Sequence, residues 1–256
     1  MSDLGAIMES VHSATDAEQA FAVLDTALQD YGFNSVCFTL ITDHSSINKS
    51  ALHGLASSYP EEWINHYNDN SYHDADPVRQ RMLTSSIPFF WKDAVRDHGE
   101  LLDTNPEALA RSNRVMDEAK EAGIADGFGV QFLSKTGELS GLGASRERPE
   151  DCNNVRDLAD VYLISSAFYE RYMSFFVDVH LPSFTKREVE VLSWAAEGKT
   201  DGEIAQIVGI QYATVRFHWN NIFKKMQVNS KLLATTTAIR HKVISPERIG
   251  FLDVID

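Results

Sequence analysis

The chain has few cysteines and no long apolar run, and each absence removes a class of protein. Its two cysteines, Cys37 in an apolar stretch and Cys152 in a polar one, lie too far apart in sequence to suggest a disulfide framework. Unpaired thiols are typical of a reducing cytoplasm. No apolar run approaches the roughly twenty residues of a membrane-spanning helix, and the N-terminal MSDLGAIMES lacks the basic start of a secretion signal. We therefore expect a soluble, cytoplasmic protein with no membrane partner.

Positive charge is scarce overall and is confined to one segment. The 256 residues carry 23 Lys and Arg against 37 Asp and Glu, a net charge of -14. Residues 181–244 hold nine basic against five acidic residues, a net of +4, whereas residues 1–180 hold thirteen against twenty-nine, a net of -16. A local basic excess is the electrostatic signature of phosphate contacts, so only residues 181–244 are a candidate for binding nucleic acid. With 43% hydrophobic residues, the chain can bury a large core and is expected to form two domains.

Signatures of catalysis and of metal binding are also missing. The sequence contains no Gly-x-Ser-x-Gly, no Walker loop and no Gly-x-Gly-x-x-Gly, and Gly127-Phe-Gly129 falls inside a strand pattern, where it indicates a bulge or close packing. His66 and His73 lie seven residues apart, without a Cys or carboxylate at metal-ligand spacing. The parallel alternation of strands and helices that a phosphoacceptor receiver domain needs is absent. We therefore expect no enzyme, no catalytic residue, no metal and no cofactor.

Residues 184–244 are predicted to form four short helices. Thr185 with Glu188, and Thr200 with Glu203, form two capping boxes that each predict the start of a helix. Gly209 allows a tight turn after the second helix, a third helix begins near residue 212, and a fourth covers about residues 230–240. The apolar side chains expected to face inward on the first two helices are Val189, Leu192, Trp194, Ala196, Ile204, Ala205, Ile207 and Val208. Two helices joined by a short turn with Gly make a helix-turn-helix.

The exposed residues of the third helix decide whether this segment is only a packed helical unit or a DNA-binding domain. Helical spacing predicts that its buried residues are Val215, Trp219, Ile222 and Met226. The opposite face then presents Ala213, Arg216, Phe217, Asn220 and Lys224. This face suits a major groove, because arginine can pair with guanine and asparagine with adenine. The other DNA-binding candidates are Thr200 and the expected phosphate contacts Lys199, Thr214, Lys224 and Lys225.

Residues 184–244 also match a known sequence motif. The segment resembles the C-terminal DNA-binding domain of LuxR-type regulators, whose motif is matched by Thr185, Arg187, Glu188, Leu192, Trp194, Gly198, Lys199, Thr200, Glu203, Ile204, Ala205, Thr214, Val215, His218, Asn221 and Ile222. The match covers the whole segment. In that family the fourth helix contributes to dimer contacts, so the resemblance implies a homodimer.

Residues 1–173 alternate helical and strand-like segments. Thr15 with Glu18 forms a capping box that predicts a helix ending at Gly32. Further helices are predicted from Pro60, from Pro77, over residues 105–123 and over about residues 153–176; strands are predicted at residues 35–42, 51–56, 87–91, 128–134 and 138–146. Residues 93–106 are expected to be a surface loop or a lid, with the loop preferred. The fold class is therefore α+β: an α/β/α sandwich with an antiparallel sheet, followed by an all-α four-helix domain.

A cluster of aromatic residues and one carboxylate stands out in the N-terminal part. Tyr59, Trp63, Tyr67, Asp76 and Trp91 fall within thirty-three residues and can line an apolar pocket with a few convergent polar groups. The spacing alone favours a plainer interpretation. Aromatic residues four apart on a helix are usually core, and an Asp before Pro is usually a helix N-cap.

Resemblance again favours the ligand site. The stretch is similar to the autoinducer-binding domain of the LuxR-type family, matched at Trp63, Tyr67, Asp76, Pro77, Trp91 and Gly127, where the ligand is an N-acyl-homoserine lactone. The resemblance implies that Trp63 donates to the lactone carbonyl, Asp76 accepts from the amide N–H and Tyr59 donates to the acyl carbonyl. Tyr67 and Trp91 would form walls. A buried carboxylate without a donor is costly, so Asp76 would select for the amide and couple binding to folding.

Two positions depart from the family's pattern. Gln131 stands where Pro is common, and Gly143 stands where many members place a Ser or Thr that helps to hold the ligand. Gly129, Gly141 and Gly143 also remove side chains from the sheet, so we expect a roomy pocket for a long or bulky acyl group.

Together these observations predict a quorum-sensing transcriptional regulator. Residues 1–173 would bind the lactone, 174–183 would link, 184–244 would bind a palindromic site on double-stranded DNA as a homodimer, and 245–256 would be a tail, with RNA polymerase as a further partner. One alternative is an orphan regulator that answers a non-lactone or foreign signal, or none. Another is a catalytic or protein-interaction module tethered to DNA.

Overall fold

The protein folds as two compact units, one reaching residue 178 and the other starting at residue 179. The structure is a computed structural model and describes residues 3–44, 47, 49–148, 155–176 and 182–245. The centre of the predicted linker and nearly all of the predicted tail lie outside these residues. Each unit is described by itself.

A five-stranded antiparallel sheet forms the middle of the N-terminal unit. Its order is β2-β1-β5-β4-β3, and it comprises β1 (Ser35–Leu40), β2 (Leu52–Ser57), β3 (Phe89–Phe90), β4 (Asp126–Leu133) and β5 (Leu139–Arg146). Strands β4 and β5 form the predicted hairpin, in register from Asp126 opposite Arg146 to Leu133 opposite Leu139. Successive residues of these strands point to opposite faces, so the sheet has two faces to cover.

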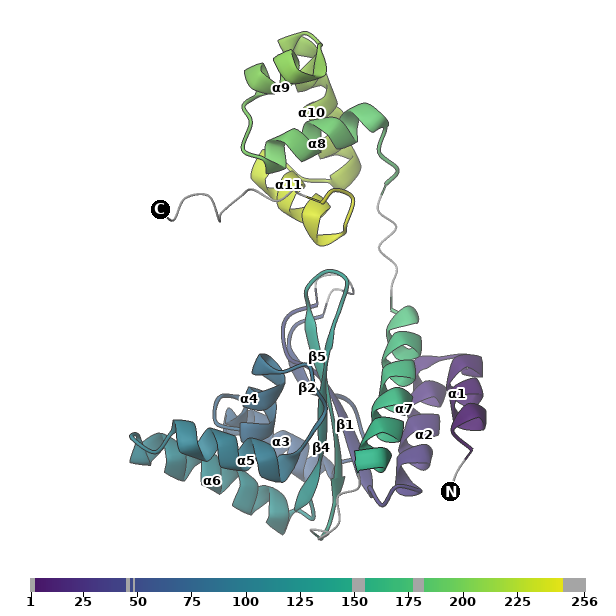
Figure 1. Cartoon of the computed structure of the whole chain (residues 1–256), viewed down its shortest axis with the longest axis vertical. Coiled ribbons are helices and arrows are strands. Elements are labelled where there is room, and N and C mark those ends of the chain that lie inside the picture. Colours follow the sequence, from purple (N-terminus) through teal and green to yellow (C-terminus); the bar gives the residue numbers. More distant parts are fainter. Residues whose placement is uncertain (1–2, 45–46, 48, 149–154, 177–181, 246–256) are drawn as a thin grey trace. The chain divides into compact units, whose positions relative to one another are not determined.

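Helices cover both faces of the sheet. Figure 1 shows α1 (Leu4–Ser13), α2 (Ala17–Gln29) and α7 (Val155–Ser174) on one face. The other face carries α3 (Glu61–Asp69), the short 3-10 helix η2 (Tyr72–Asp74), α4 (Pro77–Thr84), α5 (Trp91–Leu101) and α6 (Pro106–Glu121). Each face has its own core: Phe38, Phe128 and Phe168 belong to the first, and Trp63, Tyr67 and Trp91 to the second. The predicted α/β/α sandwich is confirmed.

Three local predictions in this unit are wrong. Asp16, not Thr15, caps α2, because its carboxylate accepts the Gln19 N–H; the Gln19 side chain in turn accepts the Thr15 N–H, so the whole box is shifted by one residue. Strand β3 has only two residues, and Trp91 begins a helix. The stretch expected to be a loop, residues 93–106, is mostly α5.

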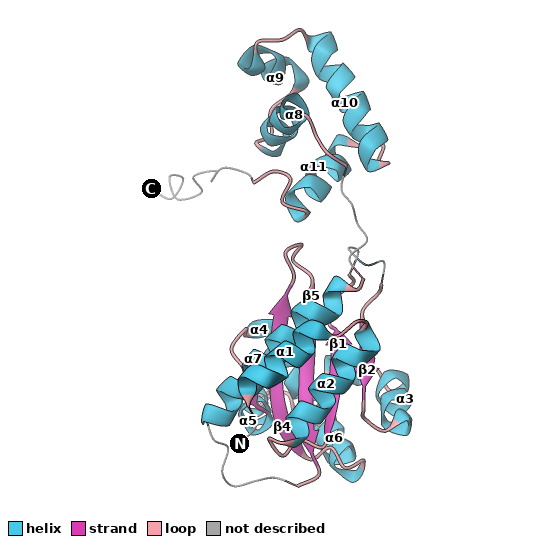
Figure 2. Ribbon diagram, turned by 90° about the vertical axis from the view of Figure 1, so that its right-hand side faces the viewer, coloured by secondary structure: helices cyan, strands magenta, loops and turns pink. Residues whose placement is uncertain are grey.

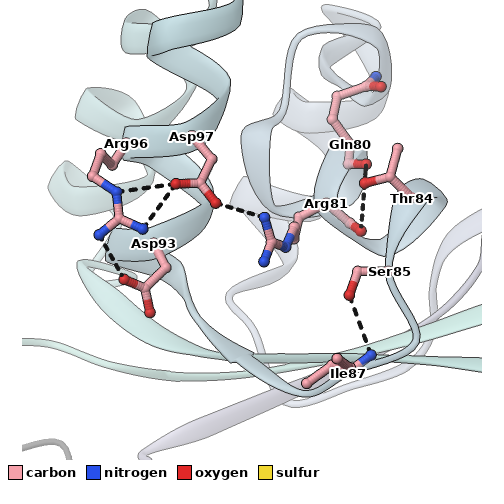
Figure 3. Close-up of polar contacts among 8 residues, drawn as sticks. All are labelled: Gln80, Arg81, Thr84, Ser85, Ile87, Asp93, Arg96 and Asp97. Atoms are coloured by element: carbon pink, nitrogen blue, oxygen red, sulfur yellow. Dashed lines mark hydrogen bonds and ion pairs between the residues drawn. The ribbon is translucent and has the colours of Figure 1, made fainter.

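One ion pair joins α5 to α4, and two more lie within α5 (Figure 3). Arg81 on α4 pairs with Asp97 at 2.6 Å, and Asp97 also pairs with Arg96 at 2.8 Å. Arg96 reaches back to Asp93 at 3.1 Å. The Arg96 guanidinium beside it holds the pKa of Asp97 below its usual range. These contacts fix the helix that carries Trp91 at its start.

The C-terminal unit contains the four predicted helices, α8 (Lys186–Ala196), α9 (Asp201–Val208), α10 (Tyr212–Met226) and α11 (Lys231–Arg240) (Figure 2). Both capping boxes, at Thr185 and at Thr200, are present. Gly209 ends α9 with φ 71°, the left-handed conformation that glycine adopts without strain. The predicted inward face needs two corrections, because Val191 rather than Val189 is fully buried and Ile207 is 46% exposed.

Candidate ligand pocket and candidate nucleic-acid interface

A pocket lies on the second face of the sheet, within the core that α3 to α6 form there. Five of the predicted site residues line it: Tyr59, Trp63, Tyr67, Asp76 and Trp91. Gly143 of β5 is also part of the wall. The structure therefore brings together residues that span eighty-five positions of sequence. Most of the remaining wall is apolar.

Asp76 combines the two roles that the sequence left as alternatives. It is the N-cap of α4, and its Oδ1 accepts the Val78 N–H at 2.8 Å. Its Oδ2 accepts the Tyr67 hydroxyl at 2.9 Å, and the same carboxylate lines the pocket. Burial raises the pKa of Asp76, although the hydrogen bonds from Tyr67 and the backbone and the Arg79 charge all oppose the rise. The ionised carboxylate is therefore incompletely compensated by its protein partners.

Tyr59 and Trp63 supply polar hydrogens to the same pocket. Burial raises the pKa of the Tyr59 hydroxyl well above its usual range, so it stays protonated and able to donate. The Trp63 side chain is buried, lies against the pocket, and its indole N–H has no hydrogen-bond partner among residues 3–44, 47, 49–148, 155–176 and 182–245. One carboxylate and two donors thus converge on an apolar cavity, which suits an uncharged ligand with both an N–H and carbonyl groups.

Trp91 and Gly127 act as a pair rather than as two ligand contacts. The Trp91 indole donates to the Phe128 carbonyl at 3.0 Å, which fixes the ring as a wall. A Cβ at Gly127 would meet the Ala144 carbonyl and would lie 2.8 Å from Cε2 of Trp91. Gly127 therefore makes room for the tryptophan and does not line the pocket; Pro77 is buried at the first turn of α4 and does not line it either.

The expectation that three glycines enlarge the pocket is wrong at two of them. A Cβ at Gly129 would lie 2.6 Å from the Phe89 ring, and one at Gly141 would lie 2.5 Å from the Met82 sulfur. Their space is already filled by these side chains. At Gly143 a Cβ would be less crowded, at 3.3 Å from the Tyr59 hydroxyl oxygen, which is a tight contact, and at 3.5 Å from Trp91.

Sequence reasoning missed a polar group on the sheet side of the pocket. Cys37 and Thr39 of β1 and His53 of β2 line it together. His53 Nδ1 lies 3.2 Å from Thr39 Oγ1, and Nε2 lies 3.8 Å from Cys37 Sγ. Burial lowers the pKa of His53 to about 4 and raises that of Cys37 to about 11, so both are neutral at neutral pH. Alternation would have found Cys37 and Thr39, since they share one face of a strand with Ile41.

The predicted reading face of α10 is exposed as expected. Val215, Trp219 and Ile222 are buried, while Arg216, Asn220 and Lys224 are exposed and Phe217 is 59% exposed. Lys199 is exposed and Thr214 is half-buried. The Thr200 hydroxyl is already used, because it donates to Glu203 Oε2 at 2.7 Å within the capping box.

Two internal ion pairs hold this helix in place. Asp201 on α9 accepts the Trp219 indole N–H at 3.0 Å and pairs with Lys231 at 2.5 Å, which joins α9, α10 and α11. Lys225 pairs with the buried Glu188 at 2.7 Å and donates to the Ser183 carbonyl at 2.8 Å. Lys225, which the sequence assigned to phosphate, is therefore a structural link within the unit.

Comparison with known families agrees with both halves of this description. Residues 16–172 match the autoinducer binding domain, and residues 182–238 match the bacterial regulatory proteins of the luxR family. The chain belongs to the LuxR family. It is an autoinducer-binding, LuxR-type transcriptional regulator, and regulators of this family are not enzymes.

Three relatives show how far the likeness extends. The quorum-sensing regulator RhlR of Pseudomonas aeruginosa is 28% identical over 239 residues, 90% of each chain. SdiA, an Escherichia coli protein, is solved in complex with octanoyl-rac-glycerol; that structure has a TM-score of 0.72 at 20% identity, covering 97% of this chain and 100% of its own. CepR2 of Burkholderia cenocepacia, an N-acylhomoserine-lactone-dependent factor, has a TM-score of 0.53 at 20% identity, covering 68% of this chain and 96% of its own.

Among the described residues, no helix has the length and apolar character to cross a membrane. Within the same residues, no three His, Cys, Asp or Glu side chains gather in a way that would hold a metal ion.

Proposed function

We propose that the pocket binds an N-acyl-homoserine lactone and that binding controls a cytoplasmic, DNA-bound homodimer. The observation that carries the proposal is Asp76, a buried carboxylate whose pKa is raised even though Tyr67 and Val78 donate to it. A ligand N–H would add a further donor. Hydrogen bonds to charged groups contribute about 1.5–3 kcal/mol, which makes the amide the main selective feature of the ligand.

The remaining polar groups fit the rest of such a ligand. In this arrangement Trp63 donates its unpaired N–H to the lactone carbonyl, and Tyr59 donates to the acyl carbonyl. Tyr67 and Trp91 close the apolar walls. Because the ligand fills space inside the second core of the unit, its binding stabilises the native state by mass action.

The C-terminal unit supports the DNA half of the proposal. In this proposal the exposed Arg216 and Asn220 of α10 read bases, and the exposed Lys199 and Lys224 and the half-buried Thr214 contact phosphates. Helix α11 leaves Leu232 76% exposed and Leu233 49% exposed. Apolar residues left on a helix surface favour association, and a two-fold dimer would place two reading helices on a palindromic site about one DNA turn apart.

A thermal-shift series with full-length protein tests the ligand. Homoserine lactones with acyl groups of four to twelve carbons should raise the melting temperature, and the same compounds should change a gel shift on a palindromic promoter site. A lactone series with no effect on either measurement would contradict the proposal.

One specific observation favours a second candidate, an orphan regulator with a non-lactone signal. Gly143 offers no side-chain hydroxyl to hold the ligand, and the related SdiA has been solved with octanoyl-rac-glycerol, which has no lactone and no amide. Monoacylglycerols in the same thermal-shift series separate the two candidates. A larger rise in melting temperature with the homoserine lactones favours the lactone, and a larger rise with the monoacylglycerols favours the second candidate.

A further inference from the structure

The sheet side of the pocket holds a polar group that the proposed contacts leave unused. Three of the proposed ligand contacts, Trp63, Tyr67 and Asp76, come from α3 and the start of α4. Thr39 and His53 come instead from the neighbouring strands β1 and β2. Buried polar groups need partners, so an imidazole in an apolar wall calls for an explanation.

Thr39 contacts the Nδ1 side of His53. The Thr39 hydroxyl oxygen accepts the Gly54 N–H at 3.4 Å and lies 3.2 Å from His53 Nδ1 and 3.6 Å from Cys37 Sγ. In the arrangement that we infer, the Thr39 hydroxyl donates its hydrogen to His53 Nδ1. A neutral imidazole carries one N–H, and with Nδ1 as the acceptor that hydrogen is on Nε2. The pKa of His53, lowered to about 4 by burial, keeps the ring neutral.

The Nε2–H then lacks a good partner. Within the described part of the chain, its hydrogen-bonding contact is Cys37 Sγ at 3.8 Å, and a thiol sulfur is a weak acceptor. His53 also lies close to the proposed amide site. Its ring stacks on the Tyr67 ring with centroids 4.0 Å apart, and the Tyr67 hydroxyl donates to Asp76. A single aromatic ring therefore separates the imidazole from the carboxylate that would bind the ligand amide.

From this placement we infer that His53, oriented by Thr39, donates a hydrogen bond to an oxygen on the acyl chain near the amide, and so selects acyl groups that carry a keto or hydroxyl oxygen over plain ones. The inference rests on the proposed lactone function and narrows its ligand class. Cys37 lies beside the contact and accepts only weakly, so it competes little with a ligand oxygen.

The test compares three ligands of one chain length on the full-length protein. N-octanoyl-, N-(3-oxooctanoyl)- and N-(3-hydroxyoctanoyl)-homoserine lactone are titrated by calorimetry. The native protein should bind the two oxygenated compounds about tenfold more tightly than the plain one, as one net hydrogen bond predicts. In His53→Phe, which keeps a ring to stack on Tyr67, the three affinities should become equal.

Two further variants separate orientation from general damage. Thr39→Val leaves His53 in place but removes the group that fixes its tautomer, so the preference should fall to about threefold. His73→Leu removes an imidazole that lines an outer groove beside the pocket but does not line the pocket itself, and it should keep the full preference.

Each outcome has a separate meaning. Equal binding of the three ligands by the native protein overturns the inference and leaves the lactone function intact. A preference that survives in His53→Phe overturns the role of His53. Absence of binding for every lactone overturns the proposed function, and this inference with it.

Discussion

Asp76 and Asp201 each accept a hydrogen bond from an aromatic side chain, and they differ in their other partners. Asp201 accepts from the Trp219 indole and pairs with Lys231, so a full positive charge from the protein itself faces it. Asp76 accepts from the Tyr67 hydroxyl and from backbone N–H groups at the start of α4, and burial raises its pKa even though these bonds and the Arg79 charge oppose the rise. The Asp201 carboxylate is therefore paired with a charge that it contacts directly, whereas burial outweighs the protein partners of Asp76.

This difference suits the two units to different roles. A site that the chain satisfies internally holds its helices in one arrangement and is suited to presenting a fixed reading surface. A site that lacks a donor gains free energy only when a ligand supplies one, so it is suited to sensing. Substitutions at the two carboxylates should therefore affect different measurements.

The largest expected effect is on ligand affinity. Asp76→Asn keeps the ability to cap α4 but loses the charge, and it should weaken lactone binding by about 2–3 kcal/mol, since hydrogen bonds to charged groups are the strong ones. Isothermal titration of the full-length protein measures this. Asp201→Asn is the matched control: it should lower the stability of the C-terminal unit and DNA affinity while leaving lactone affinity unchanged. Equal loss of lactone binding in both variants would remove the distinction.

The next effect concerns the sheet beneath the pocket. Gly127→Ala places a methyl group against the Ala144 carbonyl and Trp91, so it should lower the free energy of unfolding by about 1–3 kcal/mol, as overpacking does. Gly143→Ala meets its neighbours at 3.3 and 3.5 Å, so it should change stability by less than about 1 kcal/mol and act mainly on ligand affinity. Chemical denaturation without ligand checks both. A stable Gly127→Ala protein would show that Trp91 can move.

On the reading helix, two exposed cations should behave differently. Arg216→Ala should weaken binding to the specific site by about 1–3 kcal/mol, because a base contact is lost. Lys224→Ala should weaken binding to all sequences alike and reduce the slope of affinity against salt by about one. Fluorescence anisotropy at several salt concentrations measures both quantities. The division fails if both variants lose affinity equally on specific and random DNA.

The smallest expected effects are on the pH dependence of stability. Glu118 and Asp76 should contribute to it with opposite signs. Hydrogen bonds from Tyr72, Arg114 and His66 hold the pKa of Glu118 at about 2, so its stabilisation is present above its unfolded value of 4.5 and is lost as pH falls towards 2. Asp76 has a raised pKa, so its ionised form costs stability at neutral pH and the cost is relieved as pH falls.

Denaturation of the free protein between pH 7 and pH 3 tests these signs. At neutral pH Glu118→Gln should be less stable than the native protein by about 1 kcal/mol, whereas Asp76→Asn should be at least as stable as the native protein. Both differences should shrink at low pH. A destabilised Asp76→Asn protein at neutral pH would mean that the chain already satisfies this carboxylate.

Sequence patterns predicted most of the fold because most elements begin with chemistry that is local. The capping boxes at Thr185 and Thr200 and the prolines at Pro77 and Pro106 mark helix starts through contacts within one turn, and all four were found. Helix α5 was missed although it is amphipathic, with Trp91 and Ala94 buried. The many polar residues of this stretch favoured a loop, and the Arg81–Asp97 pair that joins α5 to α4 is a contact that periodicity cannot predict.

The pocket was predicted only in part, because some of its residues lie in local motifs and others do not. Tyr59, Trp63, Tyr67, Asp76 and Trp91 carry recognisable motifs, and all five line it. His53 carries none, because its position matters only once β2 pairs with β1 and brings it beside Thr39. The glycines were misjudged because a missing side chain does not show whether a neighbour fills the gap; at Gly129 and Gly141, Phe89 and Met82 do.

The most direct test of the central claim changes one atom of the ligand. An acyl-homoserine lactone is compared with the analogue in which an ester oxygen replaces the amide N–H, on the native protein and on Asp76→Asn, as a double-mutant cycle. The native protein should bind the ester at least tenfold more weakly than the amide, and the difference should shrink in Asp76→Asn, whose side chain keeps only a neutral acceptor. Equal binding of amide and ester by the native protein would show that Asp76 does not accept a hydrogen bond from the ligand.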